Sequence, residues 1–278
     1  MSDATVAGPG AGTPIAWPLR AWFAAEVFFG VAALLSIGLD PGNTEDGWAW
    51  PIEPVVMAAV LGAFYFAVAP IMLLALIAKR WEMVRVIVPT AILFTSAELL
   101  ATFLHWEKFS TGTTPFYLWF ASYLLPPPIF LATYLWQQRR SAPRSPSDQP
   151  LPARLRTLIF VLGGFLSVEA VVAFAYPPWF TDDFPWSLTP LTARALSGFL
   201  LAVGALMVTM AVENDRDRVR LASPMLILVL PAVAFQVARY SEQVDLSHFR
   251  VYLGVVLFGL VAGCGVALAR GSWRSALA

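Results

Sequence analysis

Long apolar stretches separated by short polar links dominate the pattern along the chain. An α-helix needs about 20 apolar residues to cross the hydrocarbon core of a bilayer. The chain has eight such stretches, which predict an all-α, polytopic membrane helix bundle with about eight transmembrane helices. The predicted spans cover residues 20–39, 54–78, 86–105, 116–137, 157–175, 189–212, 221–239 and 250–269.

The basic residues fall mainly in alternate links between these spans. Fourteen of the 18 lysine and arginine residues lie on one predicted side, and the others are Lys108, Arg194, Arg239 and Arg250. Cytoplasmic loops of membrane proteins carry an excess of lysine and arginine, so both termini are predicted to be cytoplasmic. The tryptophans fall near the predicted span ends, where we expect them to anchor the helices at the two interfaces.

The composition agrees with a membrane location and limits the classes of partner that we expect. Hydrophobic residues make up 58% of the chain and charged residues only 13%, against about 25% charged in soluble domains. The bilayer is therefore the first expected partner. A net charge of zero gives no reason to expect nucleic acid. The single cysteine, Cys264, excludes an intramolecular disulfide and a multi-cysteine metal site. We expect no cofactor and no metal.

The two halves of the chain resemble each other. The segment WAWPIEPVVMAAVLGAF from Trp48 matches FPWSLTPLTARALSGFL from Phe184, and Arg85 pairs with Arg220 in the same alignment. Four spans in each half predict a parallel 4+4 internal repeat, related by an axis along the membrane normal. The predicted organisation is a disordered tail (1–15), a first four-helix repeat (16–138), a cytoplasmic linker (139–154) and a second repeat (155–278).

Charged residues inside predicted spans are costly and point to function by default. Five are present: Glu26, Glu98, Glu169, Arg194 and Arg239. Two arrangements are open: a polar pocket that opens outward, or separate salt bridges with arginines reaching the headgroups. Gln236 shares a helix face with Arg239, and His105 shares one with Glu98. The candidate binding residues are the charged residues expected toward the outer side together with these two: Glu98, Glu169, Arg194, Gln236, Arg239 and His105. No catalytic residue is predicted.

A second candidate region lies beside Tyr123, where Pro126–Pro128 interrupts the fourth span. Such a break is tolerated where protein or a water-filled cavity covers the freed carbonyls. It is also explained by a kink alone. His105 and His248 lie at or beyond helix ends, where we do not expect them to ligate a haem.

Three short motifs carry a resemblance. They are W-x-x-x-P from Trp50, L-H-x-x-x-F around His105, and W-x-x-x-Y-x-x-x-P from Trp119. Together they resemble uncharacterised bacterial multi-pass membrane proteins, often of actinobacterial type. The resemblance implies a bacterial cytoplasmic (inner) membrane and implies no activity.

Three classes of function remain open from the sequence. The first is a permease for a small polar solute or ion, based on the intramembrane carboxyl groups and broken helices. The second is a non-catalytic subunit or scaffold with partners in a membrane complex, based on short loops and no catalytic motif. The third is an enzyme acting on lipid, which would use His105, Glu107 or Asp182–Asp183 at the outer interface.

Overall fold

The computed structural model describes residues 12–141, 147 and 149–270. Within these ranges the chain is helical, and the only extended pairing is an isolated bridge between Pro14 and Arg80. Eight helices in the described ranges are long and apolar enough to cross a membrane. The predicted all-α, multi-pass membrane fold is confirmed at this level.

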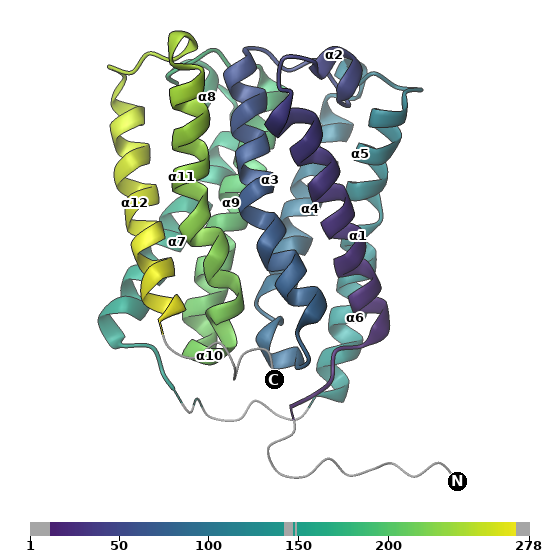
Figure 1. Ribbon diagram of the computed structural model, residues 1–278, viewed down its shortest axis with the longest axis vertical. Coiled ribbons are helices and arrows are strands. Elements are labelled where there is room, and N and C mark those ends of the chain that lie inside the picture. The colour runs from purple at the N-terminus through teal and green to yellow at the C-terminus, as the bar shows by residue number, and fades with distance from the viewer. Residues whose placement is uncertain (1–11, 142–146, 148, 271–278) are drawn as a thin grey trace.

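The eight spans stand side by side in an upright bundle (Figure 1). In chain order they are α1 (Trp17–Ala33) with the π-helical turn η1 (Leu34–Leu39), α3 (Val55–Ile77), α4 (Ile87–Leu104), α5 (Thr114–Leu124) with α6 (Pro126–Arg140), α7 (Ala153–Ala175), α9 (Pro190–Glu213), the continuous segment α10 (Arg216–Val219), η4 (Arg220–Ala222) and α11 (Ser223–Arg239), and α12 (Phe249–Ala269). The predicted span boundaries agree with these to within a few residues.

Short helices close the links at both ends of the bundle. The upper end in Figure 1 carries α2 (Thr44–Gly47) and α8 (Pro178–Thr181), and the lower end carries α10. Single 3-10 turns precede α4 and follow α4 and α11, at η2 (Trp81–Met83), η3 (Trp106–Lys108) and η5 (Ser241–Gln243). The start of α1 and the end of α12 lie at the same, lower end.

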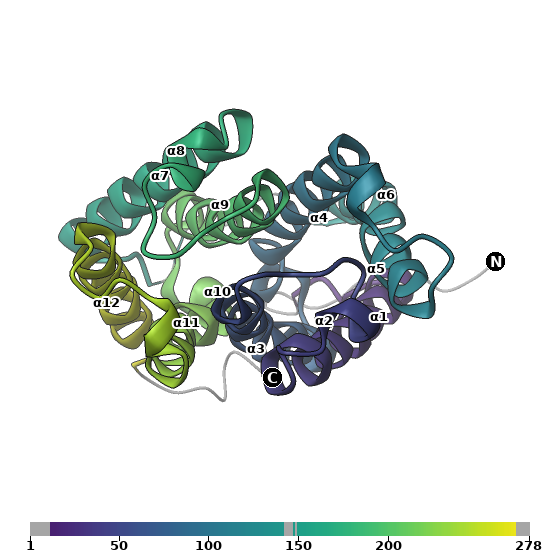
Figure 2. The same cartoon turned by 90° about the horizontal axis from the view of Figure 1, so that it is seen from above.

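Two helices, α3 and α9, occupy the centre of the bundle (Figure 2). α3 packs against α1 and α11, and α9 packs against α7 and α4. α4 also packs against α5 and α6, and α11 packs against α12. The outer helices leave large apolar side chains such as Val168 and Tyr252 exposed, where lipid tails would contact them.

Glycines set the closest helix approaches. A Cβ on Gly163 of α7 would lie 2.8 Å from the carbonyl oxygen of Gly204 on α9, and the reverse contact is equally short. A Cβ on Gly62 of α3 would meet the backbone of Gly38 in η1. Small residues allow such backbone contact, which supplies the van der Waals packing that holds membrane helices together.

An ionic network lies at the lower end, where α9 ends and α4 begins. The Arg85 guanidinium contacts the Glu213 carboxylate through two nitrogens, and Arg218 Nη1 lies 3.2 Å from Glu213 Oε1. Arg220 pairs with Asp217 at 3.1 Å. Arg85 and Arg220, which the repeat alignment pairs, are therefore both buried and both ion-paired.

The predicted tail and linker are only partly described. Residues 1–11, 142–146 and 148 lie outside the described residues. Of the predicted tail, the Thr13 amide donates to the Glu82 carboxylate and Ile15 is buried. Of the predicted linker, the carbonyl oxygen of Gln149 accepts from the Arg216 amide. The segments at both of these positions are held against the lower end.

The prediction that the tryptophans anchor the interfaces is wrong for several of them. Trp17 and Trp179 are exposed, as an anchor should be. Four others are buried instead, because they pack against other aromatic rings or helices inside the bundle: Trp48, Trp50, Trp81 and Trp119.

The Gly163–Gly204 contact can be tested with a neighbouring control. Gly163→Ala should destabilise the protein by about 1–3 kcal/mol, because the added methyl group overpacks a backbone contact. Gly164→Ala should be neutral or slightly stabilising, since a Cβ there meets open space and alanine favours a helix. Thermal unfolding of both purified variants in detergent measures the difference. Equal unfolding temperatures would contradict the α7–α9 packing described above.

Candidate functional site

The six predicted binding residues lie in separate places. Arg194 and His105 contact each other, and Glu169 belongs to a different cluster near α8 and α12. Gln236 and Arg239 make other contacts again. Glu98 is buried between α4 and α9. The structure therefore does not bring all six into one pocket, and their role in binding stays a prediction.

Arg194 and His105 form a hydrogen-bonded pair near the upper end. Arg194 Nη1 lies 2.6 Å from His105 Nε2, and Arg194 Nε donates to the carbonyl oxygen of Phe174 at 3.0 Å. A guanidinium can only donate, so His105 Nε2 must accept and the imidazole is neutral. Partial burial and the adjacent Arg194 charge lower the pKa of His105 below 6.5.

Glu169 is neutralised by an arginine. Its Oε1 lies 3.1 Å from Arg250 Nη1 and accepts from the Trp179 indole at 2.9 Å. Arg250 also contacts Asp183, whose other oxygen contacts His248. This cluster joins α7, the α8 region and α12 around a pocket at the upper end. Glu169 and Asp183 share the Arg250 guanidinium, which is the salt-bridge arrangement left open by the sequence.

Gln236 and Arg239 also have structural contacts. Gln236 Nε2 donates to the Gly38 carbonyl oxygen at 3.1 Å, which ties α11 to the π-helical turn η1. Arg239 is exposed, with its guanidinium 5.0 Å from the Tyr240 ring centroid. That position at the end of α11 suits an arginine that reaches the headgroups.

A cavity of about 320 Å³ lies within the first half of the bundle. Helices α1, α3, α4 and α5 form its walls, with Phe199 and Ala202 of α9 and Met225 of α11 closing one side. It extends from Gly47, Trp48 and Thr114, toward the upper end, to Met72, Ile87 and Thr90, in the lower half of their helices. None of the six predicted binding residues lines it.

The lining is mainly apolar and aromatic, with a few polar groups among them. The aromatic residues are Phe29, Trp48, Tyr65, Phe94, Trp119, Tyr123 and Phe199. The polar side chains without a ring are Glu26, Ser36, Thr90, Thr95, Thr114 and Ser122. Among the described residues the lining therefore contains one acidic side chain and no lysine, arginine or histidine. An aromatic cavity with few polar groups is typical of a small-molecule site.

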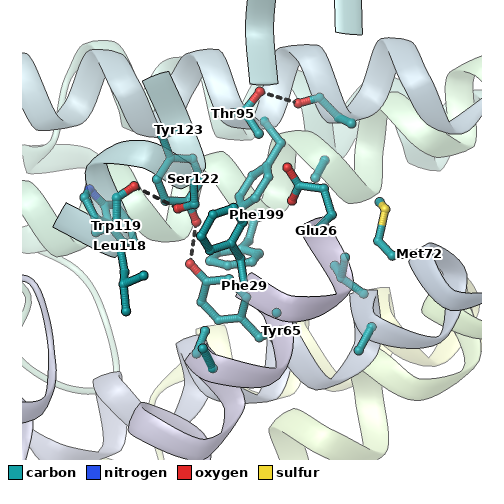
Figure 3. Close-up of a pocket in the computed structure, with 18 of the residues that line it drawn as sticks. Glu26, Phe29, Tyr65, Met72, Thr95, Leu118, Trp119, Ser122, Tyr123 and Phe199 are labelled. Atoms are coloured by element: carbon teal, nitrogen blue, oxygen red, sulfur yellow. Dashed lines mark hydrogen bonds between the residues drawn. The ribbon is translucent and has the colours of Figure 1, made fainter. Parts of the chain in front are cut away.

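Glu26 is the acidic group of this cavity. It lies near the middle of the first span, and Figure 3 shows its carboxyl group directed toward Phe199 and the tyrosines. Its Oε1 is buried with no hydrogen-bond partner among the described residues. The Trp48 indole nitrogen, also in the lining, is buried without a partner in the same part of the chain. The cavity therefore presents one unsatisfied acceptor and one unsatisfied donor.

Two tyrosine hydroxyl groups meet at the cavity wall. Tyr65 of α3 and Tyr123 of α5 hydrogen-bond to each other and are both buried (Figure 3). In such a pair one hydroxyl donates and the other accepts. The hydrogen of the accepting hydroxyl is therefore available to a further acceptor.

Glu98 lies behind this wall, one helical turn from Thr95. Its side chain is fully buried, and neither carboxyl oxygen has a hydrogen-bond partner among the described residues. The carboxyl group sits directly against Gly198 of α9, where a Cβ would collide with it. Glu98 interacts electrostatically with both tyrosines, as does Glu26.

Ion pairing separates the carboxyl groups of the described spans into two sets. Glu169, Glu213 and Asp217 each have an arginine partner. Glu26 and Glu98 have no ion-pair partner among the described residues. Because a buried charge is costly unless it is paired, the second set contains the better functional candidates.

The sequence pattern identified part of this cavity. It marked Glu26 as an intramembrane charge outside the predicted site, and it marked the region beside Tyr123 as a second candidate. Tyr123 does line the cavity, whereas Pro126–Pro128 begins α6 outside it. Tyr65 was missed, although a polar ring in the middle of an apolar span was a usable signal. Trp48 was taken as an interface anchor.

Comparison of the chain with protein-family models, with curated proteins and with solved structures finds no match.

The Arg194–His105 pair predicts a pH dependence. Since the folded pKa lies below the unfolded value of 6.5, the stability from neutral His105 is complete above pH 6.5. It is lost as the pH falls from 6.5 through the folded pKa. Between about pH 8 and about pH 5.5, wild-type protein should lose more thermal stability than His105→Gln, which accepts a hydrogen bond without titrating. An equal loss in both proteins would refute this assignment.

Proposed function

We propose that this protein is a membrane permease for small lipophilic cations, which bind in the first-half cavity with Glu26 as their counter-ion. One observation carries the proposal: the described lining is aromatic and has a single acidic group with no basic group to neutralise it. This keeps the small-solute permease predicted from the sequence and moves its site from Glu98 and Glu169 to Glu26.

Electrostatics favours a cation over other ligands. A carboxylate in low-dielectric surroundings attracts a positive charge more strongly than it would in water. Aromatic ring faces add a further attraction for cations within about 6 Å of their centroids. Tyr65, Trp119 and Phe199 supply such rings around the cavity. An anion would meet the Glu26 charge with no compensating group in the described lining.

The dimensions of the cavity support a route as well as a site. Its volume of about 320 Å³ falls within the usual range of ligand pockets, about 300–1,000 Å³. Its lining runs from Trp48 to Ile87, which lie toward opposite ends of the bundle. A solute bound at Glu26 would therefore lie near mid-membrane, where carriers place their binding sites.

We infer further that the bundle is the predicted parallel 4+4 repeat, in which only the first half has kept a binding cavity. Three hydrogen bonds recur with both partners displaced by 135 or 136 residues. The Trp81 amide donates to Thr13 O, as the Arg216 amide donates to Gln149 O. The Ser110 amide donates to Ala49 O, as the Asp245 amide donates to Pro185 O. The Arg20 side chain donates to Leu76 O, as the Arg156 side chain donates to Ala211 O.

Helix packing supports the same inference. In the proposed repeat, α3 corresponds to α9 and α4 corresponds to α11. The contact between α3 and α11 therefore corresponds to the contact between α9 and α4, and both contacts are extensive. At the same displacement Glu26 aligns with Leu162 and Tyr65 with Leu201. The second half therefore has apolar residues where the first half has its polar cavity groups.

Benzyltrimethylammonium tests the proposed site, because its charge is permanent and its neutral carbon isostere, neopentylbenzene, has the same shape. Calorimetry on purified wild-type protein should show tighter binding of the cation than of the isostere. Glu26→Gln should weaken cation binding on the order of 10- to 100-fold, or about 1.4–2.8 kcal/mol, through loss of the counter-ion. Isostere binding should not weaken.

Glu242→Gln is the matched control, since Glu242 is exposed in η5 and distant from the lining. It should bind the cation as the wild type does. Proteoliposomes should take up the cation with wild-type protein and not with Glu26→Gln. If the wild type fails to bind or to transport the cation, the permease proposal is wrong and the scaffold hypothesis gains support.

The repeat predicts equal roles for Arg20 and Arg156. Each donates to the carbonyl oxygen of the second helix of its own half, at 2.7 and 2.9 Å. Arg20→Ala and Arg156→Ala should each cost about 1.5–3 kcal/mol, the range for hydrogen bonds to charged groups. Arg154→Ala, at an exposed position, should be neutral in the same thermal assay. A loss in one half only would count against the equivalence.

A further inference from the structure

The full burial of Glu98 distinguishes it from Glu26. Glu26 is half-buried and its side chain lines the cavity, although its Oε1 is itself buried. Glu98 has no exposed surface, does not line the cavity, and has no donor or cation at either oxygen among the described residues. Desolvation therefore disfavours a charge on Glu98 more than on Glu26. When the pair holds one proton, that proton belongs on Glu98.

The tyrosine pair connects the two carboxyl groups. Tyr65 and Tyr123 interact electrostatically with both Glu98 and Glu26, and their mutual hydrogen bond leaves one hydroxyl hydrogen free for a further acceptor. Because both carboxyl groups interact with the same two tyrosines, we expect a change of charge at one to alter proton binding at the other.

A cation in the cavity changes this balance. In the resting state that we infer, the pair holds one proton and a net charge of −1, with Glu26 ionised. A bound cation neutralises Glu26, and its positive field then favours ionisation of Glu98. If Glu98 loses its proton, the two carboxylates and the cation again carry −1. Exchange of one proton for one cation thus keeps the charge of this low-dielectric region constant.

We propose that Glu98 is a proton-binding site whose proton is exchanged for the cation that binds at Glu26. This inference rests on the proposed function and adds that the proton is the ion whose movement is coupled to that of the cation. In the exchange the O–H bond of the Glu98 carboxylic acid breaks, the proton passes to bulk water, and the electron pair stays on the carboxylate. No oxidation or reduction takes place.

The titratable and charged groups around Glu98 fit this role. From α9, Gly198 contacts the carboxyl group, and Arg194, one turn away, is hydrogen-bonded to His105 and Phe174. The titratable groups of α6 lie beyond the Pro126 break, toward the lower end. Among the described residues, Tyr65 of α3 and Tyr123 of α5 interact electrostatically with Glu98, and both also interact with Glu26 of α1.

Proton release on ligand binding tests the exchange. Benzyltrimethylammonium has no dissociable proton, so any proton that appears on binding comes from the protein. In weakly buffered detergent solution with a pH indicator, the wild type should release about one proton per cation bound, the stoichiometry expected for one linked site. Cation affinity should rise with pH, by at most about tenfold per pH unit for one linked proton.

Glu98→Gln is the decisive variant. An amide resembles the neutral acid in shape and cannot lose a proton, so this variant should fold, bind the cation, release no proton and show pH-independent affinity. Glu98→Asp keeps a dissociable proton and should restore release. Proton release that persists in Glu98→Gln, or binding without release in the wild type, overturns the exchange while leaving cation binding at Glu26 intact.

Two remaining outcomes are also decisive. If the wild type does not bind the cation, the proposed function fails and the exchange fails with it. If Glu98→Gln does not fold, proton release by the wild type and by Glu98→Asp decides the exchange, and its absence from both overturns it. Wild-type affinity that does not change with pH also rules out the exchange, and that measurement needs no variant.

Discussion

The cost of removing a charge from water is the constraint on which this structure depends. Within the bilayer a charge must be paired, neutralised by a proton, or kept in contact with a cavity. Glu213 is paired with Arg85 and Arg218, and Glu169 with Arg250. These pairs connect helices at the two ends of the bundle. Glu26 and Glu98 have no such partner, and they alone among the described span carboxyls need another explanation.

The explanation we favour connects the architecture to a task. The central helices pack closely against their neighbours, α9 against α7 and α3 against η1, partly because glycines allow backbone contact. Around α3, the first half leaves an aromatic cavity with Glu26 in its wall. Gly198 of α9 provides the space that Glu98 occupies behind that wall. In the proposed mechanism, Glu26 binds the ligand and Glu98 binds only a proton.

The recurring hydrogen bonds explain how such asymmetry can arise on the repeated framework that we propose. Arg20 and Arg156 hold the first two helices of each half together in the same way. That bond needs only an arginine and a backbone carbonyl, so it constrains few side chains elsewhere. The cavity residues could therefore differ between the halves, as Glu26 and its counterpart Leu162 do, without disturbing the helix arrangement.

The sequence by itself determined the number of spans and their approximate ends, because the length of an apolar run reflects bilayer thickness directly. It also located Glu26 and Glu98 within the membrane. Only the tertiary structure decided which charges are paired, since Glu169 and Arg250 are 81 residues apart and their contact depends on helix packing. Likewise Trp48 and Trp119 looked like interface anchors, yet they pack together because the upper link folds inward. Helix rotation and loop path, which hydropathy does not encode, placed the cavity in the first half.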